Sequence, residues 1–108
     1  MGDRVKGKIA IVIGAGQTLG DTIGNGRAIA LLFAREGARV MLVDRRLDSA
    51  QEKDEITNRR NQAVPLKGGM GTAWDIAYTT LFLASDEAKF ITSVIIPVDG
   101  GMMGRVGQ

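Results

Sequence analysis

The segment that most constrains this chain runs from Ile9 to Asp44 and predicts a strand, a glycine-rich turn, a helix and a second strand. Ile9–Ile13 is an unbroken apolar run with β-branched residues, which is typical of a parallel strand buried on both faces. Arg39–Val43 is a second apolar run, and Asp44 follows it directly. A strand, glycines, a helix start and then an acid about 20 residues on are typical of dinucleotide binding.

A helix is predicted between the two strands, over Arg27–Glu36. Within it, Ile29, Leu32 and Phe33 recur at helical spacing and should face a core. Gly37 stands where a residue with left-handed backbone geometry ends a helix. The helix should therefore return the chain to the sheet directly after the glycines.

Three glycines in the turn have separate physical roles. Gly14 allows a sharp turn as the chain leaves the strand, and Gly26 allows the helix to pack close to that strand. A side chain at Gly24 would keep the backbone away from a diphosphate. The N–H groups and the positive end of the helix dipole at Asn25–Ala28 would then favour the negative charge of that diphosphate.

The spacing of the glycines is irregular, because nine residues separate Gly14 from Gly24. Gly16 and Gly20 offer other registers, and the chain contains 15 glycines, so the pattern alone is a weak signal. A strand–helix–strand unit with a loop and no ligand is the alternative interpretation. Gln17, which lies in this loop, is included among the candidate cofactor-binding residues.

The residues after the second strand bear on which dinucleotide would bind. Asp44 can accept hydrogen bonds from both ribose hydroxyls of an adenosine, and its charge would repel the 2′-phosphate of NADP. Arg45 and Arg46 would either clamp that phosphate or be solvated charges beside an exposed helix start. We expect NAD as the cofactor, with NADP as the alternative. The candidate cofactor-binding residues are Gly14, Gln17, Gly24, Asn25, Gly26, Asp44 and Arg45.

Composition excludes several classes of function. The 108 residues include no cysteine and no histidine, which excludes disulfides, histidine-activated nucleophiles and the usual zinc ligands. The net charge is only +2 and aromatic residues are few, so no nucleic-acid partner is expected. No run reaches membrane-spanning length and the first residues lack a signal-peptide core, so we expect a cytoplasmic protein with no membrane partner. The length predicts a single domain, residues 1–108.

The second half of the chain contains a charged segment, a linker and an apolar helix. Residues 45–61 predict at best a solvated helix, and residues 63–71 a linker. Thr72 should cap a helix over Ala73–Ala84, with Asp75 as its capping-box partner. Because this helix is apolar nearly all round, we expect it to be covered on more than one side.

Thr92–Val98 predicts a third strand, within which Pro97 requires an edge or a bulge. Right-handed crossovers place the second strand on one side of the first and the third strand on the other. The expected fold is α/β, a minimal Rossmann-like three-layer unit. It would have a three-stranded parallel sheet of order 2-1-3 with helices on both faces.

Both ends of the chain resemble the short-chain dehydrogenase/reductase (SDR) family. The glycine turn followed by RAIALLFAREGARVMLVDR is similar to the N-terminal end of that family. VPLKGGMGTAWDIAYTTLFLASDEAKFITSVIIPVDGG is similar to its C-terminal end. Gly14, Gly24 and Gly26 match the TGxxxGxG motif of the family, with a longer loop after the first glycine and Ile13 in place of Thr.

The middle of the family's chain has no match here. The absent segments hold its Asn-Asn-Ala-Gly strand end, catalytic Ser, Tyr-x-x-x-Lys pair and the Pro-Gly segment that lines the nicotinamide. Tyr78 is the only tyrosine, and Phe82 stands four residues later in place of Lys. In the family's chemistry the Tyr passes a proton while the Ser orients the substrate. We therefore assign no catalytic residue and no metal ligand; Tyr78 is either a packed helix aromatic or a substitute proton donor.

Three functions stay open on this basis. The first is an NAD(P)-binding protein that keeps the diphosphate and adenosine-ribose half of the site without the Ser-Tyr-Lys machinery. The second is an active minimal oxidoreductase whose site is completed by oligomerisation. Its only acid/base candidates in the C-terminal half are Lys67, Asp75, Tyr78 and Lys89. The third is a non-enzymatic interaction module.

The resemblance also implies self-association. In the family the last helix and the last strand form a subunit interface, and this chain contains a match to both. We therefore expect a homodimer or a larger oligomer, formed through the 73–84 helix and the 92–98 strand.

Overall fold

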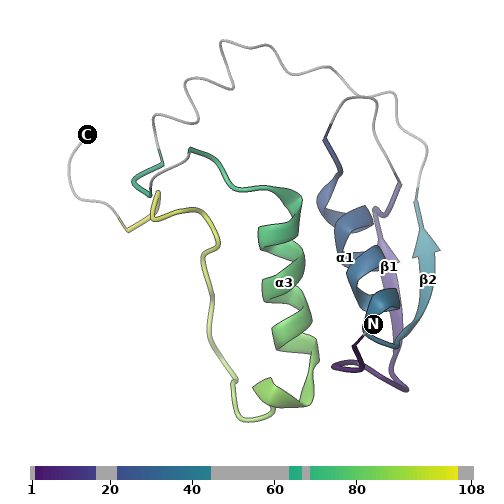
Figure 1. The fold of residues 1–108 in the computed structure, drawn as a ribbon. Coiled ribbons are helices and arrows are strands. Elements are labelled where there is room, and N and C mark those ends of the chain that lie inside the picture. The colour runs from purple at the N-terminus through teal and green to yellow at the C-terminus, as the bar shows by residue number, and fades with distance from the viewer. Residues whose placement is uncertain (1, 17–21, 45–63, 67–68, 105–108) are drawn as a thin grey trace.

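The computed structural model describes residues 2–16, 22–44, 64–66 and 69–104, and in them shows an α/β arrangement (Figure 1). The elements in chain order are β1 (Ile9–Ile13), α1 (Asn25–Arg35), β2 (Arg39–Val43), α3 (Ala73–Ala84) and the 3-10 helix η1 (Asp86–Ala88). The bounds predicted for both strands and for the C-terminal helix are confirmed. The first helix begins two residues earlier than predicted and ends one residue earlier.

β1 and β2 form a parallel pair, with Ile9 opposite Arg39 and Ile13 opposite Val43. α1 connects them, and the left-handed helix end predicted at Gly37 is confirmed by its φ of +95°. No other residue type suits this position, because a Cβ there would also lie 2.9 Å from the Cα of Lys6.

The main core lies between α1 and α3. Ala28 of α1 and Ala77 of α3 are fully buried, and such small side chains allow the two helices to approach closely. At the rim of this contact, the guanidinium carbon of Arg35 lies 5.3 Å from the ring centroid of Trp74. The buried members of the core are Val5, Ala28, Leu32, Phe33, Ala73, Ala77 and Leu81.

None of the described helices is both long enough and apolar enough to span a lipid bilayer.

The N-terminal segment before β1 is part of this core. Val5 is 1% exposed, and its N–H donates to the carbonyl oxygen of Glu36 at 3.1 Å. Lys8 Nζ also pairs with Asp86 Oδ1 at 3.1 Å. The first residues of the chain therefore hold the end of α1 and the end of α3 together.

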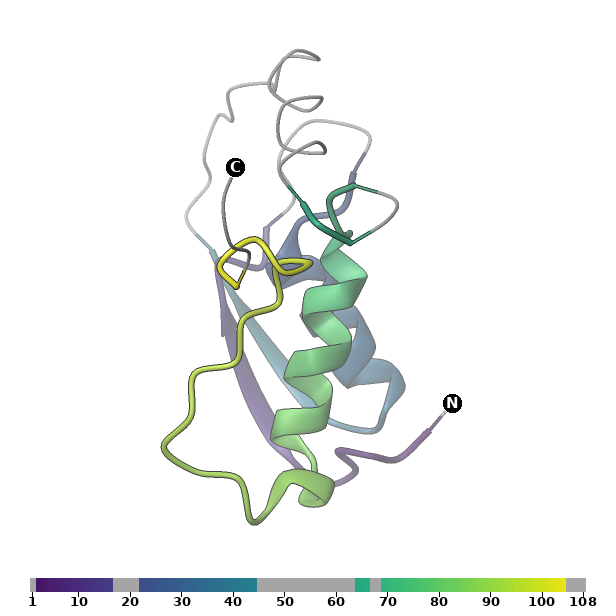
Figure 2. The same cartoon turned by 90° about the vertical axis from the view of Figure 1, so that its left-hand side faces the viewer.

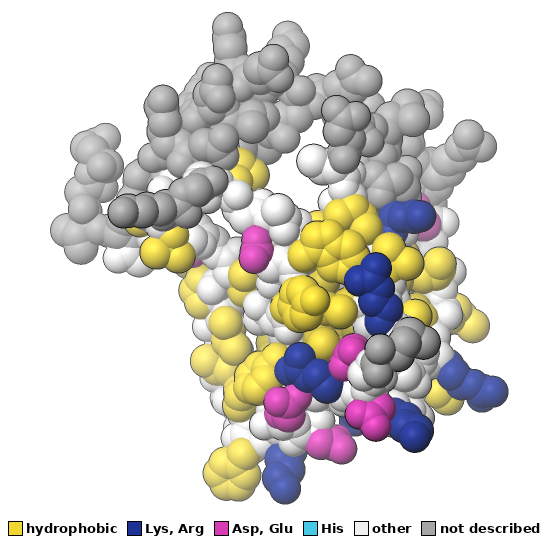
Figure 3. Space-filling model, viewed as in Figure 1, with side chains coloured by type: hydrophobic (Ala, Val, Ile, Leu, Met, Phe, Trp, Pro, Cys, Tyr) yellow, Lys and Arg dark blue, Asp and Glu magenta, His cyan; other side chains and the backbone are white. Residues whose placement is uncertain are grey.

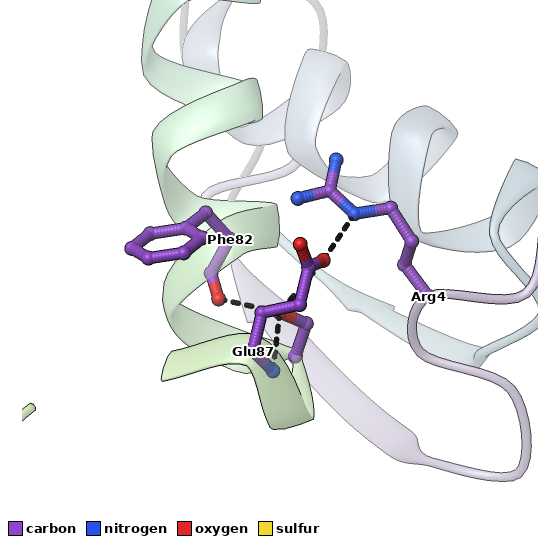
Figure 4. A network of polar contacts seen from close by, with 4 residues as sticks. Arg4, Phe82 and Glu87 are labelled. Atoms are coloured by element: carbon purple, nitrogen blue, oxygen red, sulfur yellow. Dashed lines mark hydrogen bonds and ion pairs between the residues drawn. The ribbon is translucent and has the colours of Figure 1, made fainter. Parts of the chain in front are cut away.

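A network of polar contacts completes this attachment at the end of α3 (Figure 4). Arg4 Nε donates to Glu87 Oε1 at 2.7 Å. The hydroxyl of the buried Ser85 donates to the carbonyl oxygen of Phe82 at 2.7 Å and accepts from the N–H of Glu87 at 3.3 Å. Ser85 is therefore a helix-end residue whose hydroxyl group both donates and accepts a hydrogen bond.

One face of the sheet is uncovered, which corrects two predictions. Ile9, Ile11 and Ile13 are 76%, 63% and 79% exposed, and Met41 and Val43 lie exposed beside them on β2. β1 is therefore not buried on both faces as predicted. α3 packs on α1 and not on the sheet, so both described helices lie on one side of it (Figures 1 and 2). The predicted layer of helices on each face is wrong for the part of the chain described.

The third predicted strand does not join the sheet. The described residues form one sheet of two strands, and residues 92–98 run as an extended segment with no strand pairing. This segment leaves η1 and runs on the side of α3 that faces away from the sheet (Figure 1). In Figure 1, α3 and α1 lie between this segment and β1, and the segment makes no strand pairing with β1. The order 2-1-3 is therefore replaced by the pair β1-β2.

Candidate functional site

The chain leaves β1 through a tight turn at the carboxyl end of the sheet. Gly14 has a φ of +81°, so the sharp turn predicted there is confirmed. Its N–H donates to the carbonyl oxygen of Val43 at 2.6 Å, which extends the contact with β2 by one residue. The next residue, Ala15, is buried together with Val12 and Ala30, so the turn is held under α1.

Gly26 provides the close approach of helix and strand that was predicted for it. A Cβ at Gly26 would lie 2.9 Å from the carbonyl carbon of Gly14 and 3.1 Å from the Cα of Ala15, and closer still to the Gly14 carbonyl oxygen. Backbone atoms of a strand end cannot move aside as a flexible side chain can. Glycine is therefore required here for α1 to lie on the sheet.

Gly24 precedes α1, and the described residues leave space around it. It is the N-cap residue of α1, in extended conformation at φ −77° and ψ 158°. Among the described residues, the atom nearest to a Cβ built at Gly24 would be the Gly16 carbonyl oxygen, at 3.9 Å. A side chain at this position would therefore project into the space that a ligand at the helix start would occupy.

The start of α1 presents backbone donors to that space. The first hydrogen bond of the helix runs from the N–H of Ala28 to the carbonyl oxygen of Gly24 at 3.0 Å. The N–H groups of the three residues before Ala28 thus have no intrahelical acceptor. No side chain in the described part of the chain caps this helix, and its first turn contains no acidic residue. The positive end of the helix dipole is therefore not offset by a nearby carboxylate of the helix.

Asp44 lies over the glycine turn from the end of β2. A Cβ built at Gly16 would lie 2.6 Å from the carboxyl carbon of Asp44 and overlap its Oδ2 atom. Sequence reasoning treated Gly16 only as an alternative register, whereas the structure gives it a steric role. The acid directly after the neighbouring parallel strand could have indicated this role, because both strands end at the same edge of the sheet. Asp44 itself is exposed.

The structure thus places five of the seven candidate cofactor-binding residues at one edge of the sheet. These are Gly14, Gly24, Asn25, Gly26 and Asp44. Gln17 and Arg45 lie outside the described residues, as does Arg46. Their predicted roles stay predictions.

A cleft of about 1190 Å³ opens beside the start of α1. Asn25 contributes to its lining from α1, while Thr72, Asp75 and Ile76 contribute from the start of α3. The remaining walls are formed by Ala73 and by residues 64, 66, 69–71, 97–102 and 104. The capping box predicted at the start of α3 is confirmed, with the N–H of Thr72 donating to Asp75 Oδ2 at 2.6 Å. Sequence reasoning did not find this cleft, because its walls come from segments far apart in the chain.

The acid/base candidates of the C-terminal half are not gathered at this site. Tyr78 is 54% exposed, so it is not packed in the core, and it lines a separate groove with Arg35. Asp75 lines the cleft, whereas Lys89 follows η1 at the far end of α3. Lys67 lies outside the described residues. Among the described residues there is also no cluster of three or more acidic side chains that could hold a metal ion.

Comparison with known proteins identifies the family. The family model described as Enoyl-(Acyl carrier protein) reductase matches residues 45–103, more than half of the 108 residues. The chain belongs to the short-chain dehydrogenase/reductase family. The resemblance seen at the two ends of the sequence is thereby confirmed.

Individual SDR relatives match over part of their length. 2,5-Dichloro-2,5-cyclohexadiene-1,4-diol dehydrogenase LinX of Sphingobium indicum is 39% identical over 79 residues, covering 69% of this chain and 31% of the relative. (2S)-[(R)-Hydroxy(phenyl)methyl]succinyl-CoA dehydrogenase subunit BbsD of Thauera aromatica is 34% identical over 96 residues, covering 82% and 39%. 3-Oxoacyl-[acyl-carrier-protein] reductase FabG of Chlamydia muridarum is 45% identical over 49 residues, covering 45% and 19%.

This SDR chain therefore spans no more than about two fifths of the length of these relatives. The partial coverage is consistent with the absence of a match to the middle segment of the family's chain. No solved structure gives a significant match to the chain.

Gly26→Ala tests whether the contact between α1 and β1 holds the site together. We expect the free energy of unfolding to fall by about 1–3 kcal/mol, because the added methyl group must displace the backbone of Gly14. Urea denaturation followed by circular dichroism measures this change. Gly24→Ala is the matched control and should cost less than about 1 kcal/mol, since the nearest atom of the described residues would lie 3.9 Å from its methyl group. Equal losses from the two variants would contradict the described geometry.

Proposed function

We propose that this SDR chain binds a nicotinamide dinucleotide through its diphosphate and adenosine-ribose half, at the start of α1. The observation that carries the proposal is the open, uncapped start of α1 in front of Gly24, with Asp44 lying over Gly16 beside it. Family membership supports the choice of ligand class, because SDR proteins typically use NAD(P). The residues proposed to hold it are Gly14, Gln17, Gly24, Asn25, Gly26, Asp44 and Arg45.

The diphosphate would lie on the N–H groups of Asn25 and the residues after it. Two features favour a negative charge there: N–H groups without intrahelical acceptors and a first turn without acidic residues. Gly24 leaves room for the diphosphate to approach the backbone, because a side chain there would project into that space. The positive helix end would add roughly 0.3–1 kcal/mol for each charge placed near it.

The adenosine ribose would lie against Asp44. A carboxylate accepts hydrogen bonds from two neighbouring hydroxyls, whereas it repels a 2′-phosphate. We therefore propose NAD as the preferred cofactor and NADP as the alternative.

We further propose that residues 1–108 form a single domain and that the protein is cytoplasmic.

The proposed function is binding and not hydride transfer by this chain alone. The sequence has no match to the Ser-Tyr-Lys machinery, and Tyr78 lines a groove other than the cleft beside α1. An active oxidoreductase of the SDR type, with its site completed by another copy, is the alternative. It would use the carboxyl group of Asp75, the only acid/base candidate among the described residues that lines the cleft.

Gly24→Asp tests the diphosphate site directly. Isothermal titration with NAD⁺ should show binding to the unchanged protein and an affinity at least about tenfold lower in this variant, because a carboxylate would face the diphosphate. Gly24→Asn is the matched control of the same size, and we expect it to lose less affinity because it carries no charge. Both residues cap helices well, so both variants should remain folded. Unaltered NAD⁺ affinity in Gly24→Asp, or no binding by the unchanged protein at millimolar NAD⁺, would contradict the proposal.

We also propose that the chain associates with itself through α3 and residues 92–98, as a homodimer or a larger oligomer. Hydrophobic side chains gather over α3 on the face shown in Figure 3. Tyr78 and Leu83 are exposed on this helix, and Ile95 of the unpaired segment is 91% exposed. Apolar side chains and unpaired backbone groups in one region favour association with another protein surface. This region would also serve the third candidate function, a non-enzymatic interaction module.

Ile95→Asp tests this interface. Sedimentation velocity at micromolar concentration should show an oligomer for the unchanged protein and a shift toward monomer for the variant, because a charge would be buried in the contact. Ile9→Asp, on the uncovered face of the sheet, is the comparison and should leave the oligomer intact. Dissociation by Ile9→Asp alone would assign the interface to the sheet, and a stable folded monomer of the unchanged protein would overturn the proposal.

A further inference from the structure

We infer that residues 94–98 of one copy pair as a strand with the free edge of β1 in a second copy. This inference rests on the proposed self-association and deepens it, because it names the surface that receives the unpaired segment and the backbone groups that bond to it. The strand order 2-1-3 expected within one chain would then form between two chains.

Residues 94–98 have the form of a strand without a partner. Ser93 has a φ of +58°, so the extended run begins after this bend. None of residues 94–98 makes a backbone hydrogen bond within the part of the chain that the structure describes. Val94, Ile95 and Ile96 are 56%, 91% and 41% exposed, although β-branched side chains favour a sheet. The run therefore exposes both its backbone groups and its apolar side chains.

β1 offers the complementary edge, because it pairs with β2 alone among the described residues. The carbonyl oxygen of Lys8, directly before β1, accepts from the N–H of Arg39 on β2 at 2.9 Å. Successive residues of a strand direct their backbone groups to opposite edges. Ile9, Ile11 and Ile13 therefore direct theirs away from β2, to an edge that no described residue occupies.

The outer edge of β2 is less suitable for a further strand. β2 begins with Arg39 and is followed directly by Asp44, and charged residues of this kind protect a strand edge from pairing. All five residues of β1 are apolar. The edge of β1 is thus the one that an apolar strand would join.

The segment and the edge of one copy do not meet. In Figure 1, α3 and α1 lie between residues 94–98 and β1. Each copy therefore presents one unpaired strand and one unpaired edge, and the two fit each other only between copies. Two copies that exchange these strands reciprocally form a closed dimer with two such pairings.

Pro97 determines which side of the segment pairs. Proline has no backbone N–H, so the edge that it faces lacks a donor. By the alternation along a strand, Ile95 and Pro97 face one edge, whereas Val94, Ile96 and Val98 face the other. The edge with all its donors is the second one, and it is the one that pairs with β1. Pro97 then lies on the outer edge, where it opposes the addition of another strand.

Two proline substitutions at neighbouring positions test the inference. Ile96→Pro removes a donor from the edge that faces β1, whereas Ile95→Pro removes one from the edge that Pro97 already interrupts. Neither N–H is hydrogen-bonded within the described fold, so both variants should remain folded. Sedimentation velocity should show a dimer dissociation constant that is larger by about tenfold or more for Ile96→Pro and by at most about threefold for Ile95→Pro.

The outcomes separate this inference from the proposed self-association. Equal weakening by the two prolines would overturn the pairing and leave association through residues 92–98 intact. A stable folded monomer of the unchanged protein would overturn the self-association, and the inference with it.

Engineered cysteines report the contact directly, since the chain has none of its own. A chain with Ile11→Cys, mixed with a chain that carries a cysteine in residues 94–98, should form a disulfide-linked heterodimer. Ile96→Cys reports an antiparallel pairing and Ile95→Cys a parallel one, because these residues would lie opposite Ile11. Phe90→Cys is the control, 96% exposed but outside the segment. Crosslinking to either position that is no faster than to Phe90→Cys would contradict the pairing.

Discussion

The structure depends on the packing of α1 against two neighbours at once. On one side, the absence of a side chain at Gly26 lets the helix lie on the backbone at the end of β1. On the other side, Ala28 packs with Ala77 of α3 in a contact that excludes water completely. α1 is therefore the layer between the sheet and α3. Its start is held at the carboxyl edge of the sheet, where parallel α/β structures place their ligands.

Both described helices lie on one side of the sheet, and this arrangement leaves apolar surfaces exposed. Because α3 uses its buried face on α1, nothing among the described residues covers the isoleucine-rich face of β1. Residues 92–98 are extended and unpaired, and they add to the exposed apolar surface. The starts of α1 and α3 both line one cleft, to which Asn25, Thr72 and Asp75 contribute polar side chains.

The sequence predicted the local structure well and the long-range packing poorly. Apolar runs located β1 and β2, Gly37 located the end of α1, and the capping box at Thr72 located the start of α3, since each depends on a few neighbouring residues. The predicted pairing of Thr92–Val98 with β1 was wrong, because such a pairing depends on how distant segments of the chain pack. The steric role of Gly16, the burial of Val5 and the cleft depend on contacts between distant segments, which no local pattern contains.

The central claim is that a dinucleotide's diphosphate binds at the start of α1. The most direct measurement is a ¹H–¹⁵N NMR titration of the labelled chain with NAD⁺, because it reports on each backbone amide separately. The account predicts that the largest shifts occur at the amides of Asn25, Gly26 and Arg27, with a smaller group around Asp44. Shifts confined to other segments, or amides at the start of α1 that stay unchanged at millimolar NAD⁺, would contradict it.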